Sequence, residues 1–252
     1  MYLSKKIACV IPARLASTRF PKKVLSYLGG VPLLQRVYQA AVGCEIFDEV
    51  VIAVDDMETQ KLVATFNANA VMTSPHRKNG TERLLEAKAK YGLHADVFVN
   101  WQADEPFIKK QMIEILLQTC YEKEDIWTLR KKINEEKELH DPNIVKVVVD
   151  QHKRALYFSR APIPFVRDAH QGIQFYKHIG LYAYTSEALD QIQDLSSCFI
   201  EEAESLEQLR FLYHGLSIKV HETEYESLGI DLPEHLELAE KHFSASAGYS
   251  NF

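Results

Sequence analysis

Short apolar runs alternate with amphipathic segments along the first half of the chain. Strands are predicted at 6–11, 50–54, 70–74 and 97–101, and helices at about 33–42, 58–66, from about 81, and at about 109–121. Short buried strands that alternate with helices are typical of a parallel sheet built from βαβ units. The first half, about 1–125, is therefore predicted to be an α/β fold with a doubly wound, mostly parallel sheet that binds a nucleotide.

The second half, about 126–252, has a different pattern. Strands are predicted at 126–133, 144–150, 153–160, 176–185 and 217–222, and helices at about 186–192, at about 205–213 and from Pro233. The segment 161–175 contains two prolines and a glycine, which predicts a mobile loop. Because no linker separates the halves, we expect one domain over 1–252, with the second half adding a smaller lobe or a dimer surface.

Composition limits the class of protein. Hydrophobic residues make up 46% and charged residues 25%, as in ordinary globular proteins. No apolar run approaches the roughly 18–20 residues of a membrane span, and no signal peptide is evident. We therefore expect a cytoplasmic protein without a membrane partner. The four cysteines form no C-x-x-C pair and are expected to be buried thiols.

Charge is distributed unevenly. The net charge of −6 argues against a nucleic-acid partner. Residues 1–44 nevertheless contain no Asp or Glu, and they hold seven cations: Lys5, Lys6, Arg14, Arg19, Lys22, Lys23 and Arg36. Such a local positive field suits a small polyanion such as a nucleoside triphosphate.

The loop after the first strand, "IPARLASTRFPKK", holds four of these cations. Arg14, Ser17, Arg19 and Lys23 could supply a phosphate-binding loop, since Arg and Lys form charge-assisted bonds to phosphate oxygens. A single cation here would be explained equally well by a solvated surface loop. Four of them directly after a buried strand favour phosphate binding.

Two further loops follow predicted strands and so lie where open parallel sheets bind ligands. In "KNGTERLLE", Gly80 permits close approach of the backbone and Thr81 could open a helix that meets a base or a phosphate, although a plain helix cap explains Thr81 too. In "NWQADEP", Asp104 and Glu105 follow the fourth strand. A carboxylate there could hold Mg²⁺, which binds one or two carboxylates together with phosphate oxygens; the alternative is a pair of solvated turn residues.

The first and third loops together indicate nucleotidyl transfer. In that reaction a hydroxyl attacks an α-phosphate, pyrophosphate leaves, and Mg²⁺ with Arg or Lys stabilises the developing charge.

Several motifs resemble one family. "IPARLASTRFPKKVL", "NGTERL", "NWQADEPFI", "ALYFSRAPIPF", "YKHIGLYAY", "ESLEQLR" and "GIDLPEHL" occur in the order and spacing of the 3-deoxy-manno-octulosonate (Kdo) cytidylyltransferases. The resemblance extends from Lys6 to about Phe243 and implies a Rossmann-like nucleotidyltransferase fold. It also implies the reaction of CTP with Kdo to give CMP-Kdo and pyrophosphate for lipopolysaccharide synthesis, with Mg²⁺ as cofactor and a homodimer as the assembly.

The resemblance also implies roles for residues at matching positions. The triphosphate would contact Arg14, Ser17, Arg19 and Lys23, with Arg19 and Lys23 also catalytic. Cytosine and ribose would lie near Gly80, Thr81 and Arg83. The metal would be held by Asp104 and Asp231, which would also be catalytic. The sugar would be held by Gln102, Arg160, His178, Glu207 and Gln208.

Without the resemblance, a plainer interpretation of the second-half residues would be preferred. His178 could be a hydrogen-bonded strand residue, and Glu207 and Gln208 could lie on a solvated helix face. Asp231 could simply favour a helix N-terminus two residues before Pro233.

The chain departs from the family pattern at two positions that bear on the site. The usual P-G-K-P-L is here Pro21-Lys22-Lys23-Val24-Leu25, so that Lys22 rivals Lys23 for the phosphate role. The usual Q-G-D is Gln102-Ala103-Asp104. Ala103 would either be strained, if the position needs a positive φ, or place a methyl group in the pocket.

Two alternative functions remain open at this point. The same CTP chemistry could act on another keto-sugar acid, amino-substituted Kdo or a sialic-acid-like sugar. Alternatively, a non-catalytic paralogue could bind nucleotide or sugar without turnover, for which Ala103 and Lys22 are the sequence hints.

Overall fold

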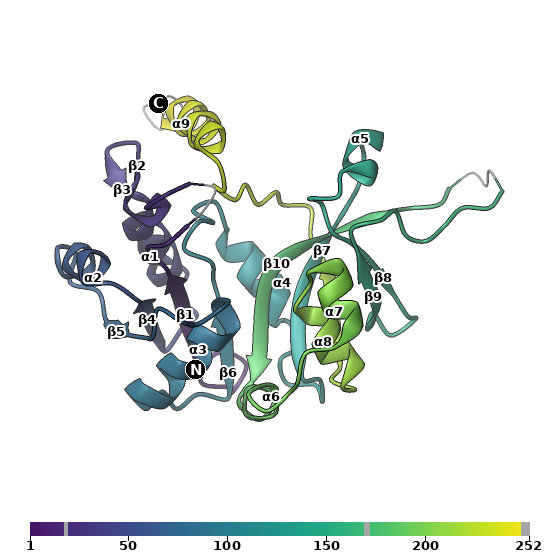
Figure 1. Ribbon diagram of the computed structural model, residues 1–252, viewed down its shortest axis with the longest axis horizontal. Helices are drawn as coiled ribbons and strands as arrows, with labels where there is room; N and C mark the ends of the chain where they lie inside the picture. The colour runs from purple at the N-terminus through teal and green to yellow at the C-terminus, as the bar shows by residue number, and fades with distance from the viewer. Residues whose placement is uncertain (18–19, 169–171, 248–252) are drawn as a thin grey trace. The chain divides into compact units, whose positions relative to one another are not determined.

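Strand β1 (Ile7–Ala13) is the centre of a parallel sheet and is buried along its whole length. It pairs in parallel with β4 (Glu49–Val54) on one side and with β6 (Val97–Asn100) on the other, and β4 pairs in parallel with β5 (Ala70–Met72). The strand order is therefore β6-β1-β4-β5 (Figure 1). The predicted α/β class with a mostly parallel sheet is confirmed.

The order of the strands contains a reversal beside β1. The chain runs from β1 through α1 (Leu33–Gly43) to β4 and through α2 (Met57–Ala64) to β5, and then α3 (Gly80–Tyr91) returns it past β1 to β6. Right-handed crossovers place α1 and α2 on one face of the sheet and α3 on the other. The carboxyl ends of β1 and β6 thus flank a topological switch point, the place where open α/β sheets bind ligands.

Three short elements and a final helix complete this part of the molecule. A 3-10 helix, η1 (Lys23–Leu25), precedes the small hairpin of β2 (Tyr27–Leu28) and β3 (Val31–Pro32). The sequence pattern did not predict these elements. The C-terminal helix α9 (Pro233–Ala247), predicted to begin at Pro233, packs beside β2.

The structure is a computed structural model that describes residues 1–17, 20–168 and 172–247. It divides into two units, Met1–Lys110 with Glu226–Phe252, and Gln111–Tyr225. The expected halves were about 1–125 and 126–252. The difference lies mainly in the C-terminal segment, which groups with the first unit because α9 and the residues before it pack on apolar side chains there.

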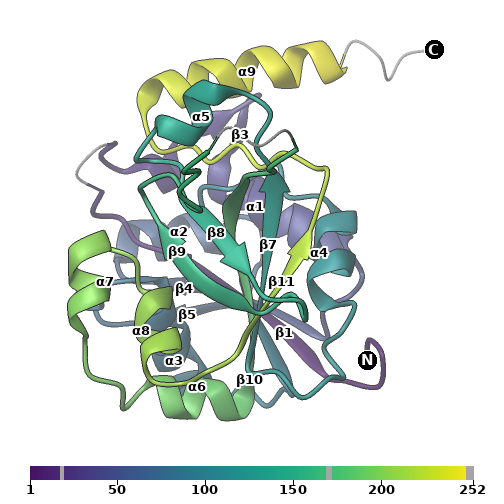
Figure 2. The same ribbon diagram turned by 90° about the vertical axis from the view of Figure 1, so that its right-hand side faces the viewer.

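The second unit is built on β7 (Ile126–Lys132), which pairs in antiparallel fashion with β10 (Tyr176–Thr185) and in parallel with β11 (Ile218–Glu222). Strand β8 (Lys146–Val149) pairs with β10 and with β9 (Ala155–Ser159) (Figure 2). The connection 160–175 contains no helix or strand among its described residues.

The helices of the second unit differ in part from the prediction. The helix α6 (Ser186–Ile192) has the expected bounds, but the single helix expected at 205–213 begins later, as α8 (Gln208–Tyr213). A separate helix, α7 (Phe199–Glu204), ends before it at Ser205, whose φ of 51° breaks the helical path. The acidic stretch after β7 forms α5 (Glu136–His140), and α4 (Lys110–Leu117) ends earlier than expected. All four cysteines are buried thiols that form no disulfide, as predicted.

A buried carboxylate fixes the start of α3 against the segment that precedes it. The side chain of Glu86 is 6% exposed and forms ion pairs with Arg77 at 2.5 Å and Lys90 at 2.6 Å. It also accepts a hydrogen bond from the Ser74 amide at 3.0 Å. Burial alone would raise the pKa of Glu86, but these donors outweigh it and lower the pKa to about 2.

We predict that replacing Glu86 by Gln lowers the free energy of unfolding by about 2 kcal/mol at pH 7, because a charged acceptor is lost from a buried network. The pKa of Glu86 is lower in the folded than in the unfolded chain. Its contribution is therefore present above about pH 4.5 and is lost as pH falls toward 2. Urea unfolding of both proteins at pH 7 and pH 3 measures this. An equal difference at the two pH values would contradict the assignment.

Candidate active site

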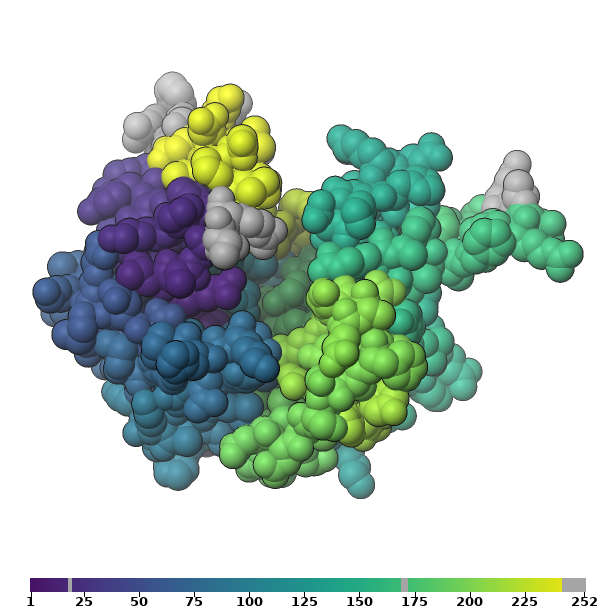
Figure 3. All heavy atoms as spheres, in the orientation of Figure 1, coloured from purple at the N-terminus to yellow at the C-terminus, as the bar shows by residue number. Residues whose placement is uncertain are grey.

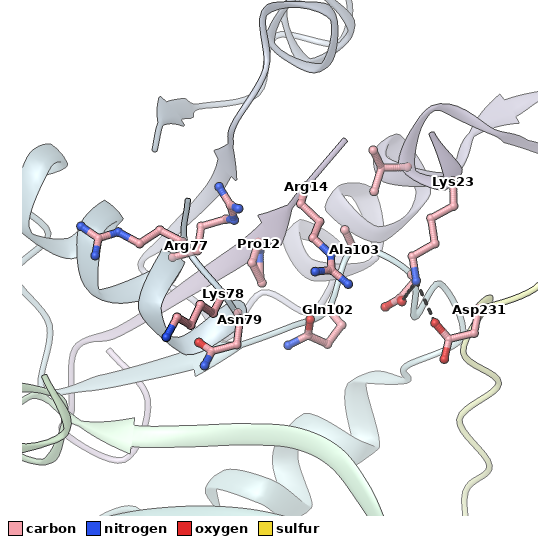
Figure 4. Close-up of a pocket in the computed structure, with 13 residues that line it drawn as sticks. Pro12, Arg14, Lys23, Arg77, Lys78, Asn79, Gln102, Ala103 and Asp231 are labelled. Atoms are coloured by element: carbon pink, nitrogen blue, oxygen red, sulfur yellow. Dashed lines mark hydrogen bonds and ion pairs between the residues drawn. The ribbon is translucent and has the colours of Figure 1, made fainter. Parts of the chain in front are cut away.

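A cavity of about 300 Å³ lies in the first unit at the carboxyl ends of β1 and β6 (Figure 4). Pro12 and Arg14 border it from the end of β1, and Gln102, Ala103 and Asp104 from the turn after β6. Five cations line it: Arg14, Lys23, Arg77, Lys78 and Arg83. Among the described residues that line the cavity, Asp104 and Asp231 are the acidic ones, so the cavity carries an excess of positive charge that suits a polyanion.

One ammonium group joins the two acidic residues of the cavity. Lys23 Nζ donates to Asp104 Oδ2 and, at 2.9 Å, to Asp231 Oδ1 (Figure 4). Lys23 is 9% exposed. Burial alone would lower the pKa of this amine, but the two carboxylates outweigh burial and raise the pKa, so that Lys23 stays protonated.

The backbone brings the two aspartates together. Asp104 lies in the turn after β6, and Asp231 lies two residues before α9. The amide of Ile230 donates to the carbonyl oxygen of Asp104 at 2.8 Å, which aligns the two segments side by side. Asp231 therefore does more than favour a helix N-terminus, since its carboxylate reaches into the cavity.

The structure separates the roles of the two adjacent lysines. Lys22 has a φ of 57°, a left-handed conformation that glycine adopts without strain and other residues adopt at a cost of about 1 kcal/mol. Its amine lies on the surface and pairs with Glu58 at 2.6 Å. Only Lys23 of the pair borders the cavity. The geometry thus favours Lys23 over Lys22 as the cation that meets a ligand.

The remaining residues of the expected phosphate loop are placed as follows. Arg14 is exposed and borders the cavity. Ser17 borders a neighbouring hollow together with Lys22 and Asp55. Arg19 lies outside the described residues.

Gly80 begins α3, and Asn79, not Thr81, caps it: the Asn79 side chain accepts a hydrogen bond from the Glu82 amide at 2.8 Å. A Cβ atom on Gly80 would come within 3.0 Å of Gln102 Nε2 and 3.3 Å of Pro12 Cγ. A side chain at position 80 would therefore have to displace Gln102 or Pro12, and the expected close approach to a ligand stays a prediction. Thr81 is 2% exposed and is not among the residues that line the cavity.

Arg83 contributes its charge from a buried position. Its guanidinium is paired with Asp55 at 3.0 Å and donates to Thr73 Oγ1 at 2.6 Å. The other carboxylate oxygen of Asp55 accepts a hydrogen bond from the Leu15 amide at 2.9 Å. Asp55 thereby ties the loop after β1 to α3.

Sequence reasoning missed three residues of this site. Asp55 follows the second strand, at the same sheet edge as the loops that were considered, and this position was the available signal. Arg77 and Lys78 directly precede the "NGTERL" motif, and both residues line the cavity. Figure 4 shows Lys78 and Asn79 lying side by side on that wall.

The structure distinguishes the two effects considered for Ala103, backbone strain and a methyl group in the pocket. It does not have a positive φ, so alanine is not strained there, and its side chain lines the cavity while being only 4% exposed. The consequence of alanine at this position is a methyl group in the pocket wall.

The acidic residues of the cavity fit a magnesium ion. Among the described residues, no group of three or more His, Cys, Asp or Glu side chains is arranged to hold a metal by itself. Mg²⁺ does not require one, because it takes one or two carboxylates and completes its shell with water and phosphate oxygens. Asp104 and Asp231 offer hard oxygen donors around a single cationic group, Lys23.

Glu105, next to Asp104, is held apart from this pair. It accepts a hydrogen bond from Ser227 Oγ at 2.9 Å. Burial, together with the charge of Asp104, raises the pKa of Glu105 to about 7. This carboxyl is therefore partly protonated at neutral pH when no cation is bound.

The expected sugar residues fall in both units. Gln102 borders the cavity of the first unit, and its amide donates to Asn100 Oδ1 at 3.2 Å. Arg160, His178, Glu207 and Gln208 lie in the second unit.

Arg160 is heavily engaged with backbone carbonyls. Its guanidinium donates to Glu204 O at 2.7 Å, Pro142 O at 2.9 Å and Ser205 O at 3.4 Å. Its own carbonyl accepts a hydrogen bond from Lys146, a fully buried ammonium held by three carbonyls. Within the described parts of the chain, three of the five guanidinium N–H groups are thus occupied and two have no partner.

His178 lies among aromatic rings, with Phe158 and Tyr182 at centroid distances of 5.0 and 5.3 Å. Burial lowers the pKa of His178 to about 3, so the ring is neutral at pH 7. Its Nε2 lies 3.0 Å from Thr128 Oγ1, whose hydroxyl faces two carbonyl oxygens. Which of the two groups donates depends on the tautomer of the ring, and Nδ1 is accordingly an acceptor or a donor.

Glu207 and Gln208 begin α8, but they do not form a solvated face. Gln208 is 6% exposed, and Glu207 accepts a hydrogen bond from Arg210 at 2.9 Å. The alternative that these residues simply face solvent is therefore wrong for Gln208.

The described part of the chain contains no helix that is both long and apolar enough to cross a membrane.

Comparisons with known proteins agree with the motifs. A cytidylyltransferase family model matches residues 8–219. A 3-deoxy-manno-octulosonate cytidylyltransferase of Thermodesulfovibrio yellowstonii is 46% identical, over 92% of this chain and 96% of that protein. The enzyme of the same name from Phocaeicola vulgatus is 45% identical, over 96% of this chain and 99% of that protein.

A solved structure gives the same result at the level of the fold. CMP:2-keto-3-deoxy-manno-octonic acid synthetase, determined in complex with CTP, superposes with a TM-score of 0.90 at 37% identity and covers 96% of this chain and 99% of its own. Motifs, fold and relatives thus agree over nearly the whole length, and the chain belongs to the 3-deoxy-manno-octulosonate cytidylyltransferases within the cytidylyltransferase family.

Proposed function

We propose that this protein activates Kdo with CTP, giving CMP-Kdo and pyrophosphate for lipopolysaccharide synthesis. The observation that carries the proposal is the convergence of Lys23, Asp104 and Asp231 in a cationic cavity at the switch point of the sheet. The names of the relatives and the CTP bound to the solved neighbour support it.

The cations of the cavity would bind the triphosphate. Arg14 and Lys23 border the cavity from the first loop, and Arg77, Lys78 and Arg83 from α3 and the segment before it. Arg19 and Ser17 belong to the same loop and are proposed to contact phosphate as well, while Gly80 and Thr81 would lie near cytosine and ribose. Because the reaction needs mainly positioning and charge stabilisation, these fixed cations account for much of what the protein must supply.

Asp104 and Asp231 are proposed to hold Mg²⁺. When bound, the ion would neutralise charge on the phosphate oxygens and polarise the phosphoryl group. Lys23 pairs with both carboxylates in this structure, offsetting one of their two negative charges, and once they have another cation it would donate to a phosphate oxygen instead.

Gln102, Arg160, His178, Glu207 and Gln208 are proposed to bind the sugar. Kdo carries one carboxylate and several hydroxyls, so it requires a cation and a set of neutral or anionic acceptors. Two N–H groups of Arg160 have no partner among the described residues and would bind the carboxylate, and neutral His178 would hydrogen-bond a hydroxyl through its other ring nitrogen.

We further propose that the enzyme acts in the cytoplasm, where CTP is made, and that it forms a homodimer. Large apolar side chains on the surface of the second unit support a dimer: Leu156 is 60% exposed and Phe165 86% exposed. Light scattering measures the mass of the purified protein, and the mass of a single chain would contradict the dimer.

The proposed function is tested by pyrophosphate release with each of four nucleoside triphosphates and a panel of keto-sugar acids: Kdo, amino-substituted Kdo and a sialic acid. We predict that CTP with Kdo gives the highest kcat/KM. Preference for another acid would support the alternative acceptor, and no pyrophosphate at all would support a non-catalytic paralogue.

We predict that Ala103→Gly changes the KM of the acceptor by less than about tenfold, since one methyl group contributes about 1 kcal/mol, and leaves the KM of CTP unchanged. The same substrate panel, run on both proteins, measures this.

We predict that Asp104→Asn and Asp231→Asn each lower kcat about 100-fold or more, because each removes one ligand of an ion that contributes several kcal/mol. CTP binding without acceptor, measured by calorimetry, should be retained in part because the cations remain. Asp194→Asn, a change at an exposed carboxylate in the second unit, is the control. Full activity in either of the first two variants would refute the metal assignment.

The adjacent lysines provide a matched pair. We predict that Lys23→Ala lowers kcat/KM for CTP about 10- to 100-fold, the value of a charge-assisted hydrogen bond, whereas Lys22→Ala stays within about twofold. Steady-state kinetics at varied CTP measures both. Equal losses would mean that Lys22 also contacts phosphate.

A further inference from the structure

An apolar cluster in the first unit lies next to the proposed metal ligands. Its core consists of four residues with no exposed surface: Leu28, Leu33, Ile230 and Ala239. Four partly buried residues pack against it: Phe20, Phe107, Leu228 and Leu236. We call these eight residues the α9 cluster, because the helix α9 contributes Leu236 and Ala239.

Members of the α9 cluster are neighbours, along the chain, of all three charged groups at the centre of the cavity. Phe20 precedes Lys23 by three positions, Phe107 follows Asp104 by three, and Ile230 directly precedes Asp231. The cluster therefore joins the three loops that carry the ammonium group and the two carboxylates.

Asp231 depends on this packing more than Asp104 does. Residues 223–232 form no helix or strand, so no regular hydrogen-bond ladder fixes the Asp231 backbone. Its segment is held by the Ile230 amide bond to Asp104 O at 2.8 Å, by Ser227 Oγ on Glu105 at 2.9 Å, and by the burial of Ile230 in the cluster. The side chain of Asp231 is also the more exposed of the two, 39% against 21%.

The helix α9 closes the cluster and is itself fastened to the β2–β3 hairpin. Glu240 Oε1 accepts a hydrogen bond from the Gly29 amide at 2.7 Å. Arg36 holds the same turn by donating to Leu28 O and, at 2.8 Å, to Gly29 O. Figures 1 and 3 both show α9, in yellow, lying directly against the purple N-terminal segment.

Electrostatics makes a rigid support necessary. Asp104 and Asp231 share one ammonium group, which offsets only one of their two negative charges, so each carboxylate repels the other while no divalent cation is bound. Two like charges that contact the same ammonium group keep their positions only if their backbones are held by other forces. On the Asp231 side these forces are apolar packing in the α9 cluster and the hydrogen bonds of Ile230 and Ser227.

We propose that Leu236 of α9 is a positioning residue for the metal site: by packing against the α9 cluster it holds Ile230, and through Ile230 it sets the position of the Asp231 carboxylate. The inference rests on the proposed function, because it takes Asp104 and Asp231 as ligands of a divalent cation. Removing the Leu236 side chain should weaken divalent-cation binding without removing any ligand.

The test uses two leucines of the same helix. Leu236 packs on the cluster, whereas Leu238 is 48% exposed and does not. We expect Leu236→Ala to raise the dissociation constant of Mn²⁺, measured by water-proton relaxation with CTP present and no acceptor, about tenfold, as the loss of a supporting contact does at other metal sites. The Mg²⁺ concentration for half-maximal pyrophosphate release should rise by a similar factor. Leu238→Ala should stay within about twofold in both measurements, and Leu236→Met should restore binding.

A second matched pair covers the case in which Leu236→Ala does not fold, as judged by circular dichroism and its melting temperature. Glu240→Gln weakens the fastening of α9 to Gly29, and Glu237→Gln changes an exposed glutamate of the same helix. A smaller rise in the Mn²⁺ dissociation constant is expected for Glu240→Gln alone.

Unchanged Mn²⁺ affinity in a folded Leu236→Ala protein, or in Glu240→Gln if the former is unfolded, would overturn the inference. So would equal effects of Leu236→Ala and Leu238→Ala. Failure of the proposed function is separate and would show as a wild-type protein that releases no pyrophosphate from CTP and Kdo, whatever the Mn²⁺ measurements give.

Discussion

The ion pairs of one buried ammonium group, that of Lys23, hold three chain segments together at the candidate active site. Lys23 Nζ touches the carboxylates of Asp104 and Asp231, and the three residues come from chain segments as far as 208 positions apart. Burying a lone lysine or a pair of aspartates would be unfavourable, whereas together they neutralise much of one another's charge. Three chain segments must therefore meet at one point: the loop after β1, the loop after β6 and the segment before α9. The surrounding fold brings these three segments together.

The parallel sheet provides the meeting point. Because the chain runs outward from β1 to β5 and then returns to β6, the loops at the ends of β1 and β6 diverge and leave a cavity between them. The absence of a side chain on Gly80 lets the start of α3 come close to both loops, and Asp55 ties the first loop to Arg83. The cations line this cavity from the loop after β1, from η1, from the segment before α3 and from α3 itself, and the aspartates are held beside them by a backbone hydrogen bond and by packing.

The hydrophobic pattern of the sequence predicted the features that depend on neighbouring residues in the chain. The strands of the parallel sheet, α6 and the start of α9 were found from periodicity and from Pro233, and the cationic loop was found from composition alone. The roles of Lys22 and Lys23 could not be separated, because a single left-handed residue decides which side chain turns inward. Local pattern could not place Asp231 near Lys23, because the two residues are far apart in the sequence. Only the family resemblance assigned Asp231 to the same site. The carbonyl contacts of Arg160 and the burial of Gln208 depend on tertiary packing in the same way.

The first unit is assembled from both ends of the polypeptide, Met1–Lys110 and Glu226–Phe252. During synthesis the parallel sheet can form as soon as its own strands have left the ribosome, but Asp231 and α9 are made more than a hundred residues later. Until then the nascent sheet has Lys23 and Asp104 without their third partner, and the apolar side chains around Leu28 have nothing to cover them. The order of translation thus keeps Asp231 away from the cavity until the intervening unit has been made.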